Sequence, residues 1–312
     1  TPNDDLDSRF ELLAAREDIL ETLGRQDERL IDLDALDALA QQLGHPVKQV
    51  EVILRRADYL YQTGSFAAAS QLARKGILMA QDNEEPLAAL LAYNRLALSE
   101  LRQDQYTEAA ADVEAGLELA RQYGFNYQET WLLTTQGMIA VEQRLIPQAQ
   151  RSFEASLNSA RSTRDRHSEA QALNNLGMLA GYQGEYPAAR VYYEQALAIA
   201  RELGVRYGEA IALGNLGYIL GMLGEYKLAY RITQDQLLIA HEIGSAYTEA
   251  YSLINLSAYA IALGNYNEAQ NHAQDGLELI RQVGEASGEA WAFTYLGHSQ
   301  FATGQLSEAR SS

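Results

Sequence analysis

Cysteine is absent from this sequence, and proline, lysine and long apolar runs are scarce. The absence of cysteine excludes disulfide bonds and thiolate metal sites, and it fits a reducing compartment, so we expect a cytoplasmic protein. Five prolines in 312 residues are too few for a disordered or fibrous chain. No apolar run reaches the roughly 20 residues of a membrane-spanning helix. With 47% hydrophobic and 21% charged residues, the composition is that of a globular protein.

Basic residues are outnumbered throughout, and the net charge is −18. The first 44 residues alone carry 12 acidic residues against 4 arginines. A chain this acidic repels phosphate backbones, so we predict no nucleic-acid partner, and the lack of long apolar runs predicts no membrane partner. The charge itself has two interpretations that stay open here: solubility, or electrostatic steering of a basic partner.

A 40-residue repeat runs along the chain. Leu-Asn-Asn-Leu-Gly at 173–177, Leu-Gly-Asn-Leu-Gly at 213–217 and Leu-Ile-Asn-Leu-Ser at 253–257 recur at this interval. Alanine holds one repeat position seven times without exception, and unrelated sequence would not keep that register. These residues are Ala69, Ala109, Ala149, Ala189, Ala229, Ala269 and Ala309.

Each repeat is predicted to form two helices. In the unit 168–207, apolar residues recur at helical spacing over 168–183, and a turn follows at 184–186. Pro187 then suits a first helical turn, and Gly204 is predicted to end the second helix near Leu203. Neither helix can bury its apolar face alone, so neighbouring units must stack to form a core. The pattern therefore predicts an all-α fold.

The repeat resembles the tetratricopeptide repeat. The residues that carry the resemblance in one unit are Leu173, Leu176, Gly177, Ala180, Ala189, Tyr193 and Ala196. The long second helix that ends in Gly204, Gly244 or Gly284 is similar to the 40-residue variant of kinesin light chains, spindle-orientation adaptors and bacterial peptide-sensing regulators. The resemblance implies a right-handed superhelical solenoid of antiparallel helix pairs. It covers 45–312, with the last repeat expected to be truncated, and 1–44 is predicted to be a degenerate first repeat or an N-terminal cap.

One stripe of the predicted first helices carries no charge in the units that start at Ala170, Ala210, Ala250 and Ala290. At 100° per residue, this stripe lies opposite the packing face, and in the tetratricopeptide family it lines the concave groove. Asparagine holds one of its positions in three successive units, and in similar repeats such a ladder binds the main chain of an extended peptide. The alternative is that these amides bond to a neighbouring helix. The predicted peptide-binding residues on the stripe are Asn174, Asn175, Asn215, Asn255, Tyr182, Tyr218, Tyr251, Trp291 and Tyr295.

Glycines within this stripe, at 181, 214 and 221, weaken a helix by about 1 kcal/mol relative to alanine, which suggests that something approaches the backbone there. The upstream groove differs, because it carries Arg95 and Arg102. These arginines are predicted to anchor an acidic residue of a ligand, with pairing to local Asp or Glu as the alternative. The chain has only three lysines, none on the stripe, so a chaperone-tail clamp is not expected.

The sequence contains no arrangement typical of catalysis. The five histidines have no metal-ligand spacing, and no phosphate-binding loop or nucleophile motif occurs. We therefore predict a protein that is not an enzyme and that uses no cofactor or metal. The leading hypothesis is a scaffold that binds an extended peptide or a partner helix in its groove, within a larger bacterial signalling protein. The opening stretch, with Arg9-Phe10-Glu11-Leu12-Leu13 and Leu33-Asp34-Ala35-Leu36, resembles the start of repeat arrays that follow ATPase domains in such multidomain regulators. The alternatives are a sensor array for a small molecule or signalling peptide, and self-association through the C-terminal end.

Overall fold

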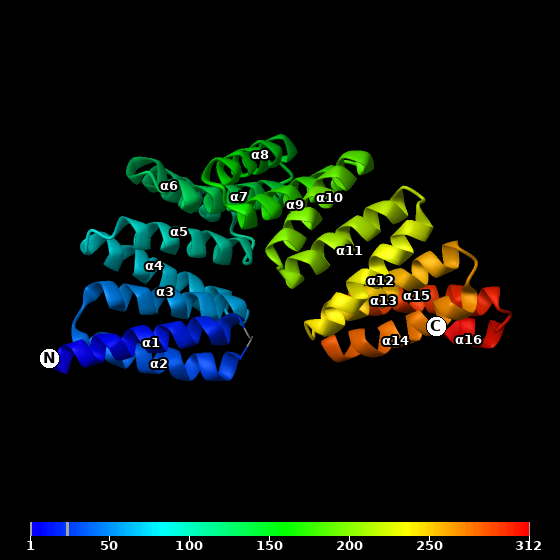
Figure 1. Ribbon diagram of the computed structural model, residues 1–312, viewed down its shortest axis with the longest axis horizontal. Helices are drawn as coiled ribbons and strands as arrows, with labels where there is room; N and C mark the ends of the chain where they lie inside the picture. The colour runs from blue at the N-terminus through cyan, green and yellow to red at the C-terminus, as the bar shows by residue number, and fades with distance from the viewer. Residues whose placement is uncertain (1, 23–24, 312) are drawn as a thin grey trace. The chain divides into compact units, whose positions relative to one another are not determined.

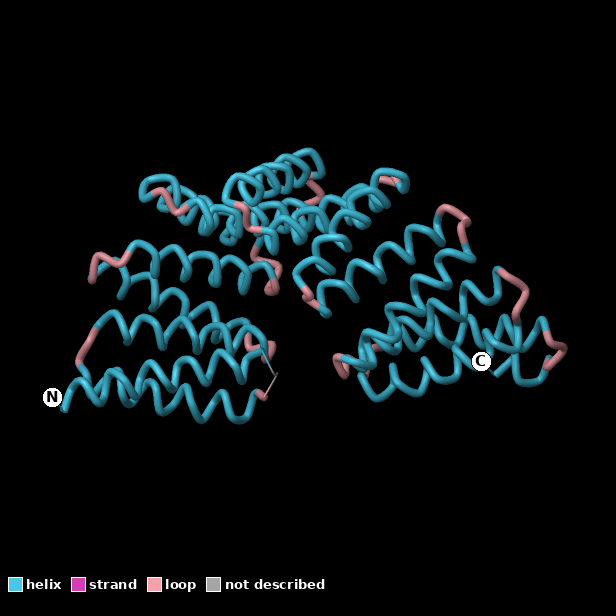
Figure 2. Tube along the Cα trace, viewed as in Figure 1, coloured by secondary structure: helices cyan, strands magenta, loops and turns pink. Residues whose placement is uncertain are grey.

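The computed structural model describes residues 2–22 and 25–311, and all the secondary structure in this part of the chain is helical. The chain divides into two compact units, Thr1–Arg164 (unit 1) and Asp165–Ser312 (unit 2). Figure 1 labels the helices of each unit, and Figure 2 shows that short loops join them. The helices of unit 1 are α1 Pro2–Thr22, α2 Gln26–Leu43, α3 Pro46–Gln62, α4 Phe66–Asp82, α5 Pro86–Leu101, α6 Tyr106–Tyr123, α7 Asn126–Glu142 and α8 Ile146–Thr163. Those of unit 2 are α9 Arg166–Tyr182, α10 Tyr186–Leu203, α11 Arg206–Met222, α12 Tyr226–Glu242, α13 Ala246–Ala262, α14 Tyr266–Val283, α15 Ala286–Ala302 and α16 Leu306–Ser311.

The repeat predicted over 168–207 is α9 followed by α10. Helix α10 ends at Leu203, and Gly204 follows in the left-handed conformation with φ of 69°. The Gly184 turn between the two helices also has a positive φ, 77°. Arg144 holds the same repeat position in unit 1 and keeps φ at 59°, although a left-handed conformation costs a non-glycine residue about 1–2 kcal/mol. The turn geometry is therefore retained where the glycine is not.

Helices pack against their neighbours in sequence, and a second set of contacts joins every other helix. Within unit 1, α3 contacts α5, and α5 contacts α7; within unit 2, α9 contacts α11, α11 contacts α13, and α13 contacts α15. Among the described residues, the backbones of the second helices of neighbouring repeats lie apart. Their side chains can still meet, since the Tyr230 hydroxyl of α12 donates to Oε1 of Glu268 in α14 at 2.7 Å. The first helices of each unit thus lie closer together than the second helices. This arrangement makes the surface of the first helices the inner side of the stack within each unit, as the repeat pattern predicts.

The alanine signature marks the closest helix contacts. Ala69, Ala149, Ala189 and Ala269 have no exposed surface at all. Small side chains at this position let the two helices of a repeat approach, and larger ones would separate them. The core of each repeat forms around these contacts.

Arg29 stands where the other repeats have alanine, and it too is fully buried. Its guanidinium pairs with the buried Glu17 at 2.8 Å (Nε to Oε1) and donates a hydrogen bond to Gln62 at 2.6 Å (Nη1 to Oε1). An ion pair thus fills the space that alanine closes elsewhere. Helices α1 and α2 pack as a helix pair, in keeping with a degenerate repeat over 1–44, although that boundary stays a prediction.

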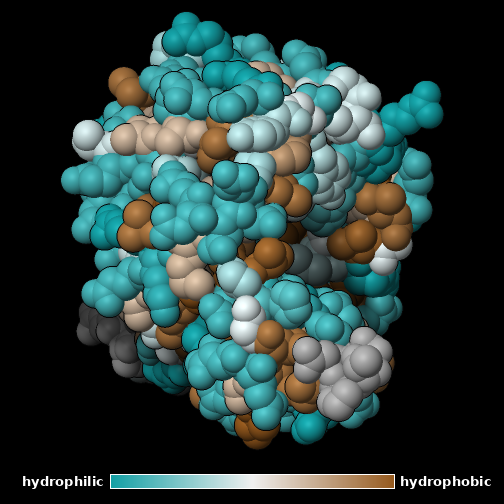
Figure 3. Space-filling view, turned by 90° about the vertical axis from the view of Figure 1, so that its left-hand side faces the viewer, coloured by the Kyte–Doolittle hydropathy of each residue, from teal (hydrophilic) through white to brown (hydrophobic). Residues whose placement is uncertain are grey.

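Figure 3 views the molecule from the left-hand side of Figure 1 and shows mostly hydrophilic side chains, interrupted by separate hydrophobic patches. Leu12, Ile19 and Ile31 are among the apolar side chains that α1 and α2 expose. None of the described helices combines the length and the hydropathy needed to cross a membrane.

Candidate functional site

Exposed aromatic side chains gather on the first helices of unit 2. Tyr182 at the end of α9, Tyr218 in α11 and Trp291 in α15 are 70%, 55% and 54% exposed, and all three lie on the predicted uncharged stripe. Large aromatic side chains normally bury much of their surface, so this degree of exposure marks a surface that could bind a partner. We call the surface formed by these residues, together with Tyr207 and Tyr247, the aromatic face of unit 2.

Tyr207 and Tyr247 extend the aromatic face beyond the predicted stripe. Both are more than half exposed, and each lies one helical turn before a stripe residue, Ile211 and Tyr251 respectively. The rings of Tyr247 and Tyr251 lie 4.8 Å apart between centroids. The sequence could have indicated these two residues, because residues i and i+4 share a helix face and each tyrosine stands four positions before a stripe residue.

Tyr218 lies at the centre of a group of phenols. Burial raises the pKa values of Tyr193, Tyr259 and Tyr295, and the nearby Tyr218 hydroxyl raises each of them further. These tyrosines belong to α10, α13 and α15, so the group joins three repeats around α11. The phenols of Tyr193, Tyr259 and Tyr295 are therefore protonated at neutral pH. A phenol can both donate and accept a hydrogen bond, and through the exposed Tyr218 the aromatic face offers such a polar group to a ligand.

The asparagine ladder is only partly free to bind a ligand. Asn215 donates a hydrogen bond from Nδ2 to Oδ1 of Asn174 in the preceding repeat, at 2.8 Å. Thr135 and Asn94 make the same contact between repeats of unit 1, also at 2.8 Å. The structure thus shows that the Asn215 amide bonds to a neighbouring helix, which was the alternative to peptide binding.

The side chains of Asn175 and Asn255 make no hydrogen bond within residues 2–22 and 25–311, and both residues are half-buried. Their amides can each donate to and accept from a peptide main chain. They are therefore the two members of the ladder whose side chains a ligand could use, and their peptide-binding role stays a prediction.

One position of the predicted stripe faces inward rather than toward solvent. Ile254, one repeat after Gly214 and two after Asn174, is only 2% exposed and packs against Gly276 of α14. At Gly214, the side chain of Gln236 in α12 lies directly over the glycine. This position therefore contacts the second helix of its own repeat, 22 residues later. A helical wheel places this position at the edge of the stripe. Because the two helices of a repeat pack tightly, a residue at this edge is buried between them.

Two glycines in the stripe are explained by the protein's own side chains. The side chain of Gln236 lies over Gly214, and a Cβ at Gly221 would lie 2.6 Å from Cε1 of Tyr259 in the neighbouring repeat. These two glycines are thus no evidence for a ligand. A Cβ at Gly181 would meet only Cδ1 of Ile219, at 3.4 Å, which is an ordinary contact.

Tyr251, Tyr295 and Trp291 are held by neighbours within unit 2. The Tyr251 hydroxyl donates to Oε2 of Glu285 at 2.6 Å, and Glu285 also accepts a hydrogen bond from the backbone amide of Ser287 at the start of α15. The rings of Trp291 and Tyr295 stack at 6.0 Å between centroids. These contacts fix the ring orientations, which lowers the entropy that a ligand would lose on binding to them.

In unit 1 the predicted arginines are largely paired within the protein. Arg95 forms an ion pair with Asp58, and its guanidinium lies over the ring of Tyr61, 4.7 Å from the centroid. Arg102 donates from Nε to the Tyr61 hydroxyl at 3.3 Å, and its side chain is exposed. The alternative of local pairing therefore describes Arg95. Arg102 forms no ion pair among the described residues and remains the arginine that a ligand could reach.

One group of carboxylates has oxygens close enough to hold a cation. Glu17, Asp18 and Glu21 each place an oxygen within 4.8 Å of the others. Arg29 and Arg55 already form ion pairs with Glu17, and Arg55 also pairs with Asp18. The arginines supply the positive charge that a metal ion would otherwise bring, so we interpret the group as part of an ion-pair network.

The fold and the repeat agree with comparisons to known proteins. Family profiles described as "Tetratricopeptide repeat" match residues 128–202 and 168–232, and a second such profile matches residues 250–283. The chain is a tetratricopeptide-repeat protein, and its fold is the all-α solenoid of that class. No curated protein sequence matches it significantly.

Several solved structures share the fold. BtubC from P. vanneervenii is 22% identical, with 72% of this chain and 92% of that chain covered and a TM-score of 0.59. A signal transduction ATPase with numerous domains and a tetratricopeptide repeat sensor, from Pyrococcus horikoshii, is 17% identical over 96% of this chain, with a TM-score of 0.73; the match covers 47% of that protein, so this chain spans about half its length.

The quorum sensor NprR from B. thuringiensis, in its apo form, is 16% identical over 96% of this chain and 82% of its own, with a TM-score of 0.65. NprR is also known in complex with its cognate peptide NprX, a structure that is 18% identical over 94% of this chain and 87% of its own, with a TM-score of 0.56. At these identities the comparisons show the shared fold. The expectation that this protein is not an enzyme stays a prediction.

Proposed function

We propose that the aromatic face of unit 2 binds an extended peptide or a helix of a partner protein. The observation that carries the proposal is the exposure of Tyr182, Tyr218 and Trp291 on a stripe without charge, in a chain whose net charge is −18. Aromatic side chains of this kind anchor protein interfaces because each buries a large area at a small cost in side-chain entropy.

The polar groups on this face suit a peptide main chain. Asn175 and Asn255 have free amides, and the Tyr218 phenol can donate or accept. The lack of charge on the stripe favours a segment that presents apolar side chains and main-chain groups rather than acidic or basic ones. The similar fold of NprR, which binds its cognate peptide NprX, supports a peptide as the ligand.

The second candidate is a sensor array that switches an attached effector domain. The observation that favours it is the likeness to the tetratricopeptide repeat sensor of the Pyrococcus horikoshii signal transduction ATPase, in which the matched region is about half of the protein. A ligand that bound one arrangement of the repeats better than another would shift that equilibrium. In both candidates the chain acts as the binding part of a larger signalling protein.

The test is an affinity capture from a lysate with the wild-type chain and two variants. The first variant, Tyr182→Ala/Tyr218→Ala/Trp291→Ala, removes the aromatic anchors, and the second, Asn175→Ala/Asn255→Ala, removes the free amides. The matched control is Tyr226→Ala/Tyr266→Ala, which removes two partly exposed tyrosines at the starts of α12 and α14. Circular dichroism checks that each variant keeps its helices.

We expect wild type and control to capture one and the same protein or peptide, and the aromatic variant to lose it. Loss in the asparagine variant as well would identify main-chain recognition. If the folded aromatic variant captures the partner as wild type does, the proposed site is wrong. If wild type captures no protein or peptide, the sensor of a small ligand becomes the better explanation.

A further inference from the structure

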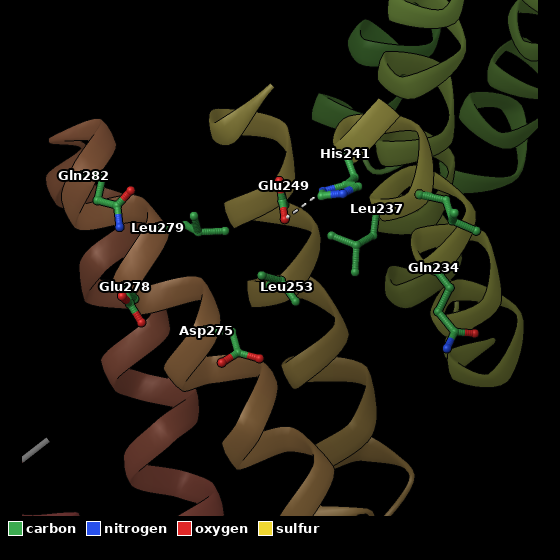
Figure 4. Close-up of a pocket in the computed structure, with 10 residues that line it drawn as sticks. Gln234, Leu237, His241, Glu249, Leu253, Asp275, Glu278, Leu279 and Gln282 are labelled. Atoms are coloured by element: carbon green, nitrogen blue, oxygen red, sulfur yellow. Dashed lines mark ion pairs between the residues drawn. The ribbon is translucent and has the colours of Figure 1, made fainter. Parts of the chain in front are cut away.

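A separate groove lies between the second helices α12 and α14 of unit 2, with α13 between them, and has a cavity volume of about 650 Å³. Figure 4 shows its residues. Gln234, Leu237, Leu238 and His241 of α12 form one wall, and Asp275, Glu278, Leu279 and Gln282 of α14 form the other. Each wall uses residues at i, i+3, i+4 and i+7, which share one face of a helix. The two sets lie 41 residues apart, so two neighbouring repeats supply the two walls of the groove.

The floor of the groove is apolar, and one rim is acidic. Leu237 and Leu279 point toward each other in Figure 4, with Leu253 of α13 between them. Leu238 is 64% exposed at the mouth of the groove. The three carboxylates in the lining are Glu249, Asp275 and Glu278, and the only basic group is His241, whose Nδ1 lies 3.7 Å from Oε1 of Glu249.

Asp275 and Glu278 form no ion pair among the described residues, although many other acidic residues of this chain do. An exposed leucine on one wall and two unpaired carboxylates on the other combine a hydrophobic contact with a site for a positive charge. Each wall spans seven residue steps, about 10 Å at 1.5 Å per residue, or two turns of helix. The dimensions and the chemistry thus match a short amphipathic helix better than a single ion or an extended anionic chain.

We propose that this groove binds a basic amphipathic helix of a partner protein, with leucine-like side chains on Leu237, Leu253 and Leu279 and Lys or Arg beside Asp275 and Glu278. A second copy of this chain is a poor occupant, because two chains of net charge −18 repel each other. The walls of the groove lie on α12 and α14, and α13 contributes Glu249 and Leu253. None of these residues belongs to the aromatic face, so we expect the two surfaces to be occupied independently.

The test uses the full chain and a defined probe. Since the sequence has no cysteine, Gln282→Cys introduces a single thiol on the groove wall that can carry an environment-sensitive fluorophore. The probe is an 18-residue peptide of leucine and lysine with leucine at i, i+3, i+4 and i+7, and its counterpart has glutamate in place of every lysine. An anisotropy titration of a labelled peptide against the unlabelled chain gives the affinity without the fluorophore on the protein.

We expect saturable binding of the lysine peptide and none of the glutamate peptide. Asp275→Asn/Glu278→Gln should weaken the affinity about 2- to 30-fold, since exposed ion pairs contribute about 0.2–1 kcal/mol each. Leu238→Ala should weaken it as well. The matched control is Glu108→Gln/Glu118→Gln in α6, which removes the same charge at exposed sites, Glu118 being at the repeat position of Glu278. The aromatic variant Tyr182→Ala/Tyr218→Ala/Trp291→Ala should bind the lysine peptide as wild type does.

Three results would overturn the proposal. The lysine peptide could fail to bind, the control variant could lose as much affinity as the groove variant, or sedimentation velocity could show a dimer that Leu238→Ala dissociates. The second result would mean general attraction to an acidic protein, and the third would make a second copy the occupant. None of them bears on the aromatic face, so the two proposals fail separately.

Discussion

The Tyr259 hydroxyl in α13 donates a hydrogen bond to the carbonyl oxygen of Gly217 in α11, at 3.0 Å. The same ring lies over Gly221, where a Cβ would come within 2.6 Å of Cε1. One tyrosine thereby joins two repeats through a hydrogen bond to the backbone and a contact that only glycine permits. Helices α11 and α13, the first helices of their repeats, approach each other closely at this point.

Gly221→Ala should therefore destabilise unit 2. The added methyl group would displace the Tyr259 ring, and overpacking of this kind costs about 1–3 kcal/mol. The gain in helix propensity, about 1 kcal/mol, offsets only part of that cost. The measurement is chemical denaturation followed by the fluorescence of Trp291, the tryptophan of unit 2, in a Trp131→Phe background.

Gly181→Ala is the control. Its Cβ would meet Cδ1 of Ile219 at 3.4 Å, an ordinary contact, so the gain in helix propensity should leave the stability of unit 2 equal or higher. Equal losses in both variants would contradict this explanation.

Asn215→Ala should cost more stability than Asn255→Ala. The first substitution removes the hydrogen bond to Asn174 and leaves the side-chain oxygen Oδ1 of Asn174 without its donor, which should lower the free energy of unfolding by about 0.5–1.5 kcal/mol. The second removes an amide that bonds to no described residue. Denaturation of the two variants in parallel measures the difference. A ligand that reads the main chain should show the reverse order, with the larger loss of affinity for Asn255→Ala, whereas the same order in stability and affinity would indicate a purely structural ladder.

Stability of unit 1 should fall as the pH rises from about 4.5 to 7. Glu100 is fully buried between α5 and α6; burial and the neighbouring Asp112 raise its pKa from 4.5 to about 7, against the opposing effect of Arg74. One Glu100 oxygen accepts from Arg74, and the other gains a partner only when a proton lies between Glu100 and Asp112. Because the folded state binds this proton more tightly than the unfolded state, its stabilisation is complete below pH 4.5 and is lost as the pH rises through 7.

The size of the effect is at most about 3 kcal/mol, at about 1.4 kcal/mol for each pKa unit. Glu100→Gln should flatten this part of the pH profile, since glutamine stays neutral and can still donate to Asp112. The measurement is the free energy of unfolding of wild type and variant at several pH values between 4 and 8, read from Trp131 in a Trp291→Phe background. An unchanged slope in the variant would rule out Glu100 as the titrating group.

Arg29→Ala should be among the most damaging substitutions in unit 1, although alanine is what the other repeats carry there. It leaves Glu17, which is 1% exposed, without its partner inside the α1–α2 pair, and breaking a buried ion pair costs about 3–5 kcal/mol. Arg25→Ala is the control, because Arg25 and its partner Glu28 are both exposed and such pairs contribute about 0–1 kcal/mol. Trp131 fluorescence during urea denaturation distinguishes the two. A loss for Arg29→Ala as small as the control's would mean that Arg55 alone compensates Glu17.

The sequence predicts the fold closely because the repeat is redundant. Ala189, Pro187 and Gly204 each mark a helix contact, a helix start or a helix end, and the same features recur in neighbouring units, so one degenerate position does not obscure the pattern. Arg29 is the exception that a pattern cannot resolve. An arginine in an alanine position indicates a missing contact, and only the structure shows that Glu17 and Gln62 fill the space.

The exposure of the aromatic residues was predicted better than the contacts of the polar residues, and the peptide-binding role of both stays a prediction. Tyr182, Tyr218 and Trp291 lie on the stripe because helical periodicity places them there, and solvent exposure follows. The roles of Asn215 and Gly221 depend on residues 41 and 38 positions away, Asn174 and Tyr259, which a helical wheel of one helix does not contain. The groove of Asp275 and Glu278 was not predicted, since it joins two second helices whose exposed residues look like ordinary solvated faces.

The pattern of contacts between helices has a mechanical consequence. Within each unit, a repeat contacts the repeats on either side of it, and among the described residues its helices contact none further along the chain. A pulling force applied along such a stack meets one interface at a time instead of a shared core. Each 40-residue repeat that unfolds would release about 130–145 Å of extended backbone, from which the length of the folded repeat along the stack must be subtracted. The protein should thus extend in small, nearly equal steps at low force, which makes it compliant along its axis.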